Sequence, residues 1–304
     1  MELHQLRYFC AVARAGNFTR AAEEQHVAQP SLSQQVRKLE DELGAKLFDR
    51  FPRFARLTDF GKAFLPKAGE ILRRVGEART EIQEMSGAEI GTVAVGAIPT
   101  IAPYFLGPVI AGFARRHPSI SISIAEEITP VLLEYLHHGR VDLVVLALPV
   151  RGDELVCEEL FREPLFAALP EDHRLAARKS VALAEIRNDP FLLLKEGHCF
   201  RENMLSACRR SRVHPRVIFE SGQFSTILSM VATGMGVSVV PAMAVEKQTK
   251  CRFVRVSDQR ASRSVGLAHL KHRFPTRAQA ALVEQLRRHA QAKYAPATST
   301  LGPH

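Results

Sequence analysis

Cys199 and Cys208 are the residues whose type and spacing could do the most specific chemistry in this chain of 304 residues. A thiolate stabilised by nearby positive charge attacks peroxides and other sulfurs. The surrounding segment is rich in such charge, from Lys195, His198, Arg201, Arg209, Arg210, Arg212 and Arg216. If residues 201 to 211 are helical, Cys199 lies just before the first turn, where the helix dipole also favours a thiolate. The segment predicts redox chemistry, and the alternative is a free cysteine that fills a small apolar site.

The spacing of this pair adds a mechanical argument. Nine residues of continuous helix separate two α-carbons by roughly 13 Å along the axis, whereas a disulfide tolerates about 7 Å at most. Closing the pair would therefore unwind the segment between the two cysteines. A close pair can also arise by chance among five cysteines. This odd count does not fit a secreted disulfide framework, and the sequence assigns no role to Cys10, Cys157 or Cys251.

The length and composition predict two or three globular domains. The apolar runs are too short to cross a bilayer, so no membrane association is expected. Residues 1–4 do not begin a signal peptide, which favours a cytoplasmic location. Of the net charge of +9, residues 1–90 carry only +1, because 14 Lys and Arg face 13 Asp and Glu. Binding of nucleic acid must therefore be argued from pattern and not from bulk charge.

The first 58 residues have the pattern of a winged helix-turn-helix. Gly16 ends a first amphipathic helix, Asn17 or Thr19 caps a second one, and Pro30 fixes the start of a third. The third helix turns Leu32, Val36, Leu39 and Leu43 inward, and two short strands around Pro52 follow it. Its outer face carries hydroxyls, amides and Arg, which suit base edges and phosphates, although a solvated surface is the alternative. The predicted DNA-binding residues are Gln29, Pro30, Ser31, Ser33, Gln34, Arg37, Arg50 and Arg53.

A long fourth helix, capped by Thr58, carries an apolar stripe repeating every three or four residues. Such a stripe is typical of a helix that packs along another helix, so it predicts dimerisation. Its residues are Phe64, Ala68, Ile71, Val75, Ala78 and Ile82. The linker is expected at Ser86-Gly87.

From residue 91 the pattern becomes strand-like runs alternating with helical ones, which predicts an α/β fold with a largely parallel sheet. A C-terminal helix bearing Leu282, Leu286 and Ala290 is expected to cover the first lobe, and the tail from about residue 295 to be disordered. Ligands collect where strands end and helices begin, which singles out Thr100 and Thr129. Either hydroxyl could simply cap its helix, or both could line a polar pocket with His198. No metal site, cofactor site or catalytic constellation is expected.

The chain resembles the LysR-type transcriptional regulators. The resemblance covers nearly the whole chain, and its N-terminal motifs are Leu6-Arg7-Tyr8-Phe9, Asn17-Phe18-Thr19-Arg20-Ala21-Ala22, Gln29-Pro30-Ser31-Leu32-Ser33-Gln34-Gln35, Leu39-Glu40, Leu47-Phe48-Asp49-Arg50 and Leu57-Thr58. It implies a DNA-binding domain over 1–58, a linker and dimerisation helix over 59–90, and a regulatory domain over 91–304. That domain would have two lobes and resemble type 2 periplasmic binding proteins.

Within this family the chain is similar to the peroxide-sensing members. Its matching segments are Gly96-Ala97-Ile98-Pro99-Thr100 and Glu196-Gly197-His198-Cys199, together with Cys208. The resemblance implies that Cys199 is oxidised to a sulfenic acid, that Cys208 resolves it, and that Thr100, Thr129, His198 and Arg263 form the peroxide pocket. It also implies a dimer of dimers that binds promoter DNA, contacts RNA polymerase and activates antioxidant genes.

Two departures from that pattern are visible: Ala28 stands where a Ser often caps the recognition helix, and the stretch 209–215 is unusually basic. The expected function is a peroxide-switched transcriptional regulator and not an enzyme. One alternative is a LysR-type regulator that binds a small organic acid between its lobes. A thiol peroxidase would suit Cys199 and His198 but would leave the helix-turn-helix unexplained.

Overall fold

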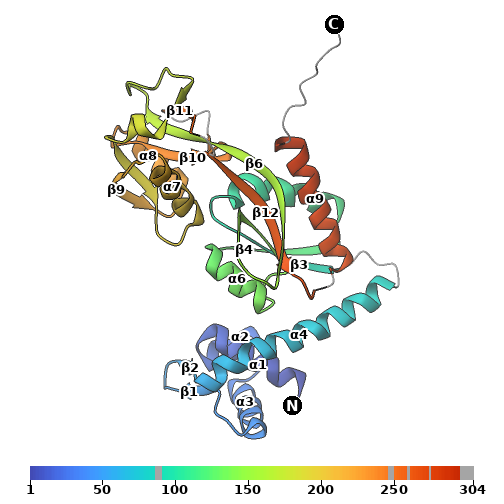
Figure 1. Cartoon of the computed structure of the whole chain (residues 1–304). Helices are drawn as coiled ribbons and strands as arrows, with labels where there is room; N and C mark the ends of the chain where they lie inside the picture. The colour runs from blue at the N-terminus through green and yellow to red at the C-terminus, as the bar shows by residue number, and fades with distance from the viewer. Residues whose placement is uncertain (86–90, 246–249, 259–260, 274, 295–304) are drawn as a thin grey trace. The chain divides into compact units, whose positions relative to one another are not determined.

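The computed structural model describes residues 1–85, 91–245, 250–258, 261–273 and 275–294 (Figure 1). The predicted linker at Ser86-Gly87 and the predicted tail from about residue 295 lie outside these ranges. The chain divides into two compact units, Met1–Ala88 with His137–Arg140, and Glu89–Leu136 with Val141–His304.

The first unit is a winged helix-turn-helix followed by a long helix. Its elements are α1 (Leu3–Ala15), α2 (Phe18–Glu24), α3 (Gln29–Leu43), the antiparallel strands β1 (Phe48–Arg50) and β2 (Ala55–Leu57), and α4 (Asp59–Met85). Gly16 ends α1 with φ of 64°. The Asn17 side chain caps α2 by accepting from the amides of Thr19 and Arg20. Thr58 caps α4 through the Gly61 amide at 3.0 Å. These contacts confirm the predicted helix boundaries.

The core of this unit contains three of the four α3 residues predicted to face inward. Leu32, Val36 and Leu39 are fully buried, but Leu43 is 39% exposed. It is the last residue of α3, directly before Gly44 ends the helix. The prediction for Leu43 was wrong for this reason.

The stripe along α4 is divided between two environments. Ala68 is buried and Phe64 partly buried in the core of the first unit, where Phe64 lies 5.3 Å from the Phe9 ring. Farther along the helix, Ile71 and Ile82 are 36% and 67% exposed. Phe64 and Ala68, two residues of the predicted dimerisation stripe, therefore pack within the first unit, where α1 contacts α4. The exposed Ile71 and Ile82 remain available to a second copy.

The second unit is built around a sheet of eight strands whose pairing is mixed. Strands β4 (Ile120–Glu126), β3 (Gly91–Ala97) and β5 (Leu143–Leu148) are parallel, as predicted. Strands β12 (Ser262–Leu270) and β6 (Leu155–Pro170) then continue the sheet with antiparallel pairing. The prediction of a largely parallel sheet was wrong because β6 was not recognised. Charged residues and Pro164 interrupt its 16 residues, LVCEELFREPLFAALP, so no simple alternation identifies it.

Strand β6 connects two lobes, each with its own hydrophobic core. Its first half pairs with β12 in lobe I, and its second half pairs with β10 and β11 in lobe II. Lobe I also contains η1 (Ala102–Leu106), α5 (Gly107–Arg116), α6 (Thr129–His137) and α9 (Arg277–Tyr294). Lobe II contains β7 (Ser180–Val181), η2 (Leu183–Ile186), β8 (Pro190–Leu194), α7 (Cys199–Arg210), β9 (Arg216–Ser221), α8 (Phe224–Ala232), β10 (Ser238–Pro241), η3 (Ala242–Ala244) and β11 (Cys251–Val256).

Helix α9 buries Leu282, Leu286 and Ala290 in the core of lobe I, which confirms the prediction for this helix. Among the helices described, none is both long and apolar enough to span a membrane.

Candidate functional sites: the DNA-binding surface and the two cysteines

The outer face of α3 presents most of the residues predicted to read DNA. Pro30, Ser31, Gln34 and Arg37 are exposed or half-buried, and Gln29 is half-buried at the start of the helix. No side chain caps α3, because Ala28 occupies the capping position. The small and polar side chains of this face can approach a nucleic-acid groove without rearrangement of the core.

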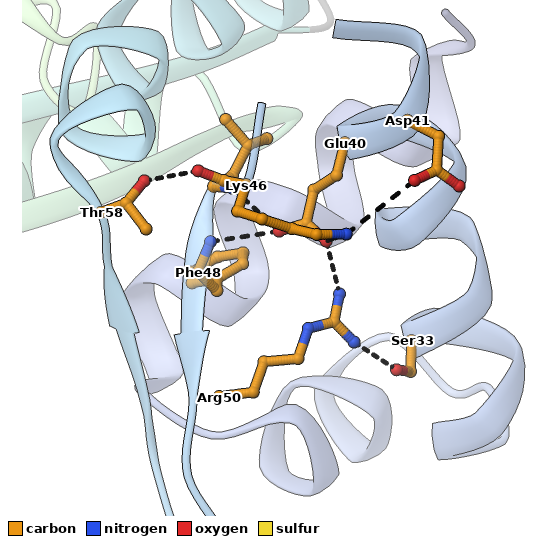
Figure 2. Close-up of polar contacts among 8 residues, drawn as sticks. Ser33, Glu40, Asp41, Lys46, Phe48, Arg50 and Thr58 are labelled. Atoms are coloured by element: carbon orange, nitrogen blue, oxygen red, sulfur yellow. Dashed lines mark hydrogen bonds and ion pairs between the residues drawn. The ribbon is translucent and has the colours of Figure 1, made fainter. Parts of the chain in front are cut away.

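Arg50 is part of the internal structure of the domain, as Figure 2 shows. Its guanidinium donates to Glu40 Oε2 at 2.8 Å and to Ser33 Oγ at 2.9 Å, and it lies 4.6 Å from the centre of the Phe18 ring. The buried Glu40 also accepts the Leu47 and Phe48 amides at 2.8 and 3.2 Å. Arg50 and Ser33 therefore fasten the wing to α3. The sequence signal for Glu40 was its place in the Leu39-Glu40 motif, but its partners were not foreseeable.

Arg53, by contrast, is exposed at the tip of the wing. Its carbonyl accepts from Asn17 Nδ2 at 2.8 Å, and the Ala55 amide donates to the Gly16 carbonyl at 2.7 Å. These backbone bonds hold the hairpin against the start of α2 and do not involve the Arg53 guanidinium. Beside it, the exposed rings of Phe51 and Phe54 stack at 4.4 Å. The wing is thus a fixed support for the exposed Arg53 side chain.

Helix α7 separates the two cysteines of interest and places them in different cores. Cys199 is its first residue, half-buried, and packs against the core of lobe I. Cys208 is fully buried in the core of lobe II, with its sulfur 3.3 Å from Met204 Sδ. Both are free thiols. The helix is continuous between them, so their α-carbons are separated by roughly 13 Å along its axis.

The cations of this segment do not gather around Cys199 as predicted. Arg201 donates to the Leu194 carbonyl at 2.7 Å and to Glu220 at 2.6 Å, so its charge is already paired. Arg209 and Arg210 lie in the last turn of α7, at the end opposite Cys199. Burial lowers the pKa of His198, which is therefore neutral at pH 7. Cys199 lies at the N-terminus of α7, a position that favours negative charge.

Arg263 and Thr100, which are far apart in sequence, are joined directly. Arg263 Nη1 donates to Thr100 Oγ1 at 2.9 Å, and its Nη2 donates to the Thr100 carbonyl at 3.2 Å. The same guanidinium pairs with Glu163 at 2.7 Å, with both side chains 1% exposed. It also lies 5.4 Å from the centre of the Phe200 ring, next to Cys199 in α7. Glu163 was missed because it lies on the unrecognised strand β6, a hundred residues from its partner.

The loop that carries His198 passes close to the start of α6. Gly197 has φ of 89°, and a side chain there would lie 3.1 Å from Ile128 Cδ1, so the loop before Cys199 touches the residue before Thr129. The Thr129 hydroxyl is buried and has no hydrogen-bond partner among the described residues. It does not cap α6, and the Thr100 hydroxyl is held by Arg263. Thus neither hydroxyl has the simple capping role considered as the alternative.

The described residues contain no cluster of three or more His, Cys, Asp or Glu placed to hold a metal ion. Of the remaining cysteines, Cys10 is partly buried, and burial raises its pKa to about 11. Burial, with a smaller contribution from the Asp258 carboxylate, likewise raises the pKa of Cys208 to about 11. Cys208 is therefore a protonated thiol at neutral pH while α7 stays folded.

A winged helix-turn-helix joined to a two-lobed α/β domain defines a class of DNA-binding transcriptional regulators. The family model "Bacterial regulatory helix-turn-helix protein, lysR family" matches residues 3–62, and the family model "LysR substrate binding domain" matches residues 86–291. The chain belongs to the LysR family of transcriptional regulators.

Several relatives are similar over most of their length. The DNA-binding transcriptional dual regulator OxyR of Escherichia coli is 34% identical over 250 residues, 82% of each chain. An uncharacterised regulator of Bacillus subtilis, YybE, is 33% identical over 90% of this chain and 94% of its own. Among solved structures, a full-length OxyR variant of Pseudomonas aeruginosa has a TM-score of 0.76 and 34% identity, covering 94% of this chain and 98% of its own. CbnR in complex with its target DNA has a TM-score of 0.71 and 26% identity, covering 95% of this chain and 100% of its own.

Proposed function

We propose that this LysR-family regulator is switched by hydrogen peroxide through oxidation of Cys199 and formation of a disulfide with Cys208. One observation carries the proposal: a single continuous helix holds the two sulfurs at opposite ends, in the cores of different lobes. A disulfide needs α-carbons within about 7 Å. Joining these sulfurs must open α7 and remove one of them from its core, which gives the oxidised protein a different shape.

The chemistry balances without any further oxidant. The Cys199 sulfur attacks one peroxide oxygen, an S–O bond forms, the O–O bond breaks, and the other oxygen leaves as water. The Cys208 sulfur then attacks the sulfenic sulfur, an S–S bond forms, the S–O bond breaks, and a second water leaves. Two thiols are oxidised by two electrons in total, and one peroxide is reduced to two waters.

In this proposal the first step takes place in a pocket lined by Thr100, Thr129, His198 and Arg263. The unpartnered Thr129 hydroxyl can donate to or accept from a peroxide oxygen. A neutral His198 can take up a proton as the thiol ionises. Arg263 cannot move freely to a ligand, because Glu163, Thr100 and Phe200 hold it. Its role is to keep Thr100 in place and to support the first turn of α7.

The output of the switch is binding to promoter DNA. We infer that Gln29, Pro30, Ser31, Gln34 and Arg37 approach base edges and phosphates, and that Arg53 reaches the backbone from the wing. Ser33 and Arg50 contribute by holding the wing to α3, which assigns them a positioning role.

The proposed organisation is a DNA-binding domain over 1–58, a linker and dimerisation helix over 59–90, and a redox-sensing domain over 91–304. The later part of the α4 stripe, Ile71, Val75, Ala78 and Ile82, would pair two copies, and two dimers would form the tetramer. The protein would act in the cytoplasm and contact RNA polymerase as an activator of antioxidant genes. The similarity to OxyR of Escherichia coli and to the Hydrogen peroxide-inducible genes activator of Dickeya chrysanthemi, at 33% identity, supports this direction.

The alternative is a small organic acid as effector, and the state of Arg263 argues against it at this site. An unpaired cation would bind a carboxylate ligand strongly, but Arg263 is already neutralised by the buried Glu163. Displacing Glu163 would leave a buried charge without a partner, which is costly.

The test is a comparison of reduced and peroxide-treated protein on the DNA upstream of its own coding region. Treatment with one equivalent of peroxide should change the footprint of the wild type, and dithiothreitol should reverse the change. The Cys199→Ser variant should give the reduced footprint under both conditions. If wild type and variant respond alike to peroxide, the sensing proposal fails.

A further inference from the structure

The two ends of α7 are anchored by different contacts. At the C-terminal end, Ser211 follows the last helical turn, and its hydroxyl donates to Asp258 Oδ1 at 2.5 Å. The other carboxylate oxygen, Asp258 Oδ2, accepts the Leu183 amide of η2 at 2.8 Å. Asp258 itself lies between β11 and β12, outside the helix. One carboxylate thus joins the end of α7 to a second element of lobe II, and both of its oxygens are used.

Cys208 lies inside the turn that this contact closes. Its carbonyl accepts the Val213 amide at 2.8 Å, and Arg212 adopts φ of 54°, a left-handed conformation that few side chains other than Asn or Asp favour. The Cys208 side chain points into the core of lobe II and is fully buried. Opening of this last turn is one way to free its sulfur for solvent or for Cys199. Opening the turn must also break the bond between Ser211 and Asp258.

We propose that Asp258 is a latch on the C-terminal turn of α7 and sets how fast Cys208 becomes available to the oxidised Cys199. This inference rests on the proposed peroxide switch and adds its regulation. The latch takes no part in the bond changes: the Cys208 sulfur attacks, the S–S bond forms, the S–O bond breaks and water leaves, as above. It controls access of the second sulfur and leaves reaction of the first with peroxide unchanged.

Two further features support a latch at this end of the helix. The Asp258 carboxylate adds to the effect of burial in raising the pKa of Cys208 to about 11, so the closed turn also keeps the thiol protonated. The anchors at the other end, Arg201 with Glu220 and Phe200 with Arg263, do not depend on Asp258. The C-terminal turn can therefore open while the first turn, with Cys199, stays in place.

The size of the effect follows from the kind of bond. A hydrogen bond to a carboxylate is about twice as strong as one between neutral groups. Losing the Ser211 bond should increase the open population of the turn, and with it any rate limited by opening, by roughly tenfold.

The experiment measures alkylation of Cys208 in the reduced full-length protein with Cys199→Ser in the background, so that no peroxide chemistry is needed. Rates are read at Cys208 by peptide mass spectrometry for the parent, Ser211→Ala, Asp258→Asn and the control Glu171→Gln. Glu171 pairs with Arg252 on the surface of the same lobe, with side chains 60% and 57% exposed. Ser211→Ala removes the latch bond and keeps both the Asp258 charge and its bond to Leu183.

The latch predicts about tenfold faster alkylation of Cys208 in Ser211→Ala and an unchanged rate in Glu171→Gln. Rates in Ser211→Ala equal to the parent would overturn it. Acceleration in Asp258→Asn alone would also overturn it, since that result would show a charge effect on the thiol without a mechanical role. Hydrogen exchange of the Val213 amide provides a second readout in the same samples, and it should be faster in Ser211→Ala.

With Cys199 present, disulfide closure after peroxide addition should accelerate in Ser211→Ala by the same factor. Formation of the sulfenic acid, trapped with dimedone, should keep its rate. If peroxide produces neither product in the wild type, the proposed function fails. The alkylation and hydrogen-exchange rates of the reduced protein would still test the latch proposal in that case.

Discussion

Replacing Arg50 by Ala should destabilise the DNA-binding domain, whereas replacing Arg53 by Ala should affect only its contact with DNA. Arg50 donates to the carboxylate of the fully buried Glu40, and its own side chain is 26% exposed. A hydrogen bond to a charged group contributes about 1.5–3 kcal/mol. In the variant, the Glu40 carboxylate still accepts hydrogen bonds from the Leu47 and Phe48 amides, so its charge is not left without any partner. We therefore expect a loss of about 2 kcal/mol, in the lower half of that range.

The assay is native-state hydrogen exchange of the full-length protein, read on peptides that contain Leu47 and Phe48. A loss of about 2 kcal/mol corresponds to roughly 30-fold faster exchange through opening of this unit. Arg53→Ala is the matched control, because the same substitution three residues along the chain removes an exposed side chain. It should leave exchange nearly unchanged, within about 0.5 kcal/mol.

The salt dependence of DNA binding should distinguish the two substitutions in the opposite way, with the direct effect in Arg53→Ala. If the Arg53 guanidinium neutralises one DNA phosphate, Arg53→Ala should reduce the slope of log affinity against log salt by about 0.9. The reasoning is refuted if Arg50→Ala exchanges at the wild-type rate and weakens DNA binding with the same reduction in salt slope as Arg53→Ala. Arg50 would then be a free DNA ligand, and the bonds drawn in Figure 2 would not hold it.

Three further outcomes are expected. Glu163→Gln should lower the free energy of unfolding of the second unit by about 3 kcal/mol or more, since it leaves the buried Arg263 charge uncompensated. Glu158→Gln, which breaks an exposed pair with Arg287, should lower the same free energy by less than about 1 kcal/mol. Equal urea midpoints for Glu163→Gln and Glu158→Gln would contradict this difference. Burial raises the pKa of the Cys208 thiol from its ordinary value of 9.0 to about 11 in the folded protein, so between these two pH values only the unfolded thiol ionises. The wild type should therefore lose stability relative to Cys208→Ser as pH rises from about 9 to about 11. Parallel curves of unfolding free energy against pH for the two proteins would contradict this. Finally, Ile82→Glu should weaken dimerisation in sedimentation, whereas Ala63→Glu, at an exposed position on another face of α4, should not.

The N-terminal domain was predictable from sequence because its signals are local. Gly16, Asn17 and Thr58 each mark a helix end through a contact within four residues, and Pro30 marks the first turn of α3 through its own backbone. The prediction for Leu43 was wrong because its burial depends on tertiary packing. Its periodicity is correct, but the sequence does not show whether another element covers the last turn of α3. The same holds for Phe64 and Ala68, because the pattern of one helix does not show whether α1 or a second copy of the chain covers them.

The candidate redox site was only partly predictable because its polar partners are distant in sequence. Cys199, His198 and the helix that follows are neighbours, and their arrangement is visible in the residues themselves. Arg263 with Glu163, and Ser211 with Asp258, come from elements separated by 100 and 47 positions. Strand β6 supplies Glu163, and its irregular sequence hid the strand. The density of cations around Cys199 was misleading, since a helix spreads residues 201–210 along its length and Glu220 pairs with Arg201.

The central claim is that peroxide joins two sulfurs that the reduced fold holds apart. Peptide mapping by mass spectrometry, after one equivalent of hydrogen peroxide and alkylation of the remaining thiols, tests it most directly. The account predicts one linked pair of peptides containing Cys199 and Cys208, two fewer alkylated thiols per chain, and loss of protection of the amides within residues 201–210. Oxidised protein in which both cysteines are still alkylated, or in which they are linked while α7 keeps its protection, would contradict it.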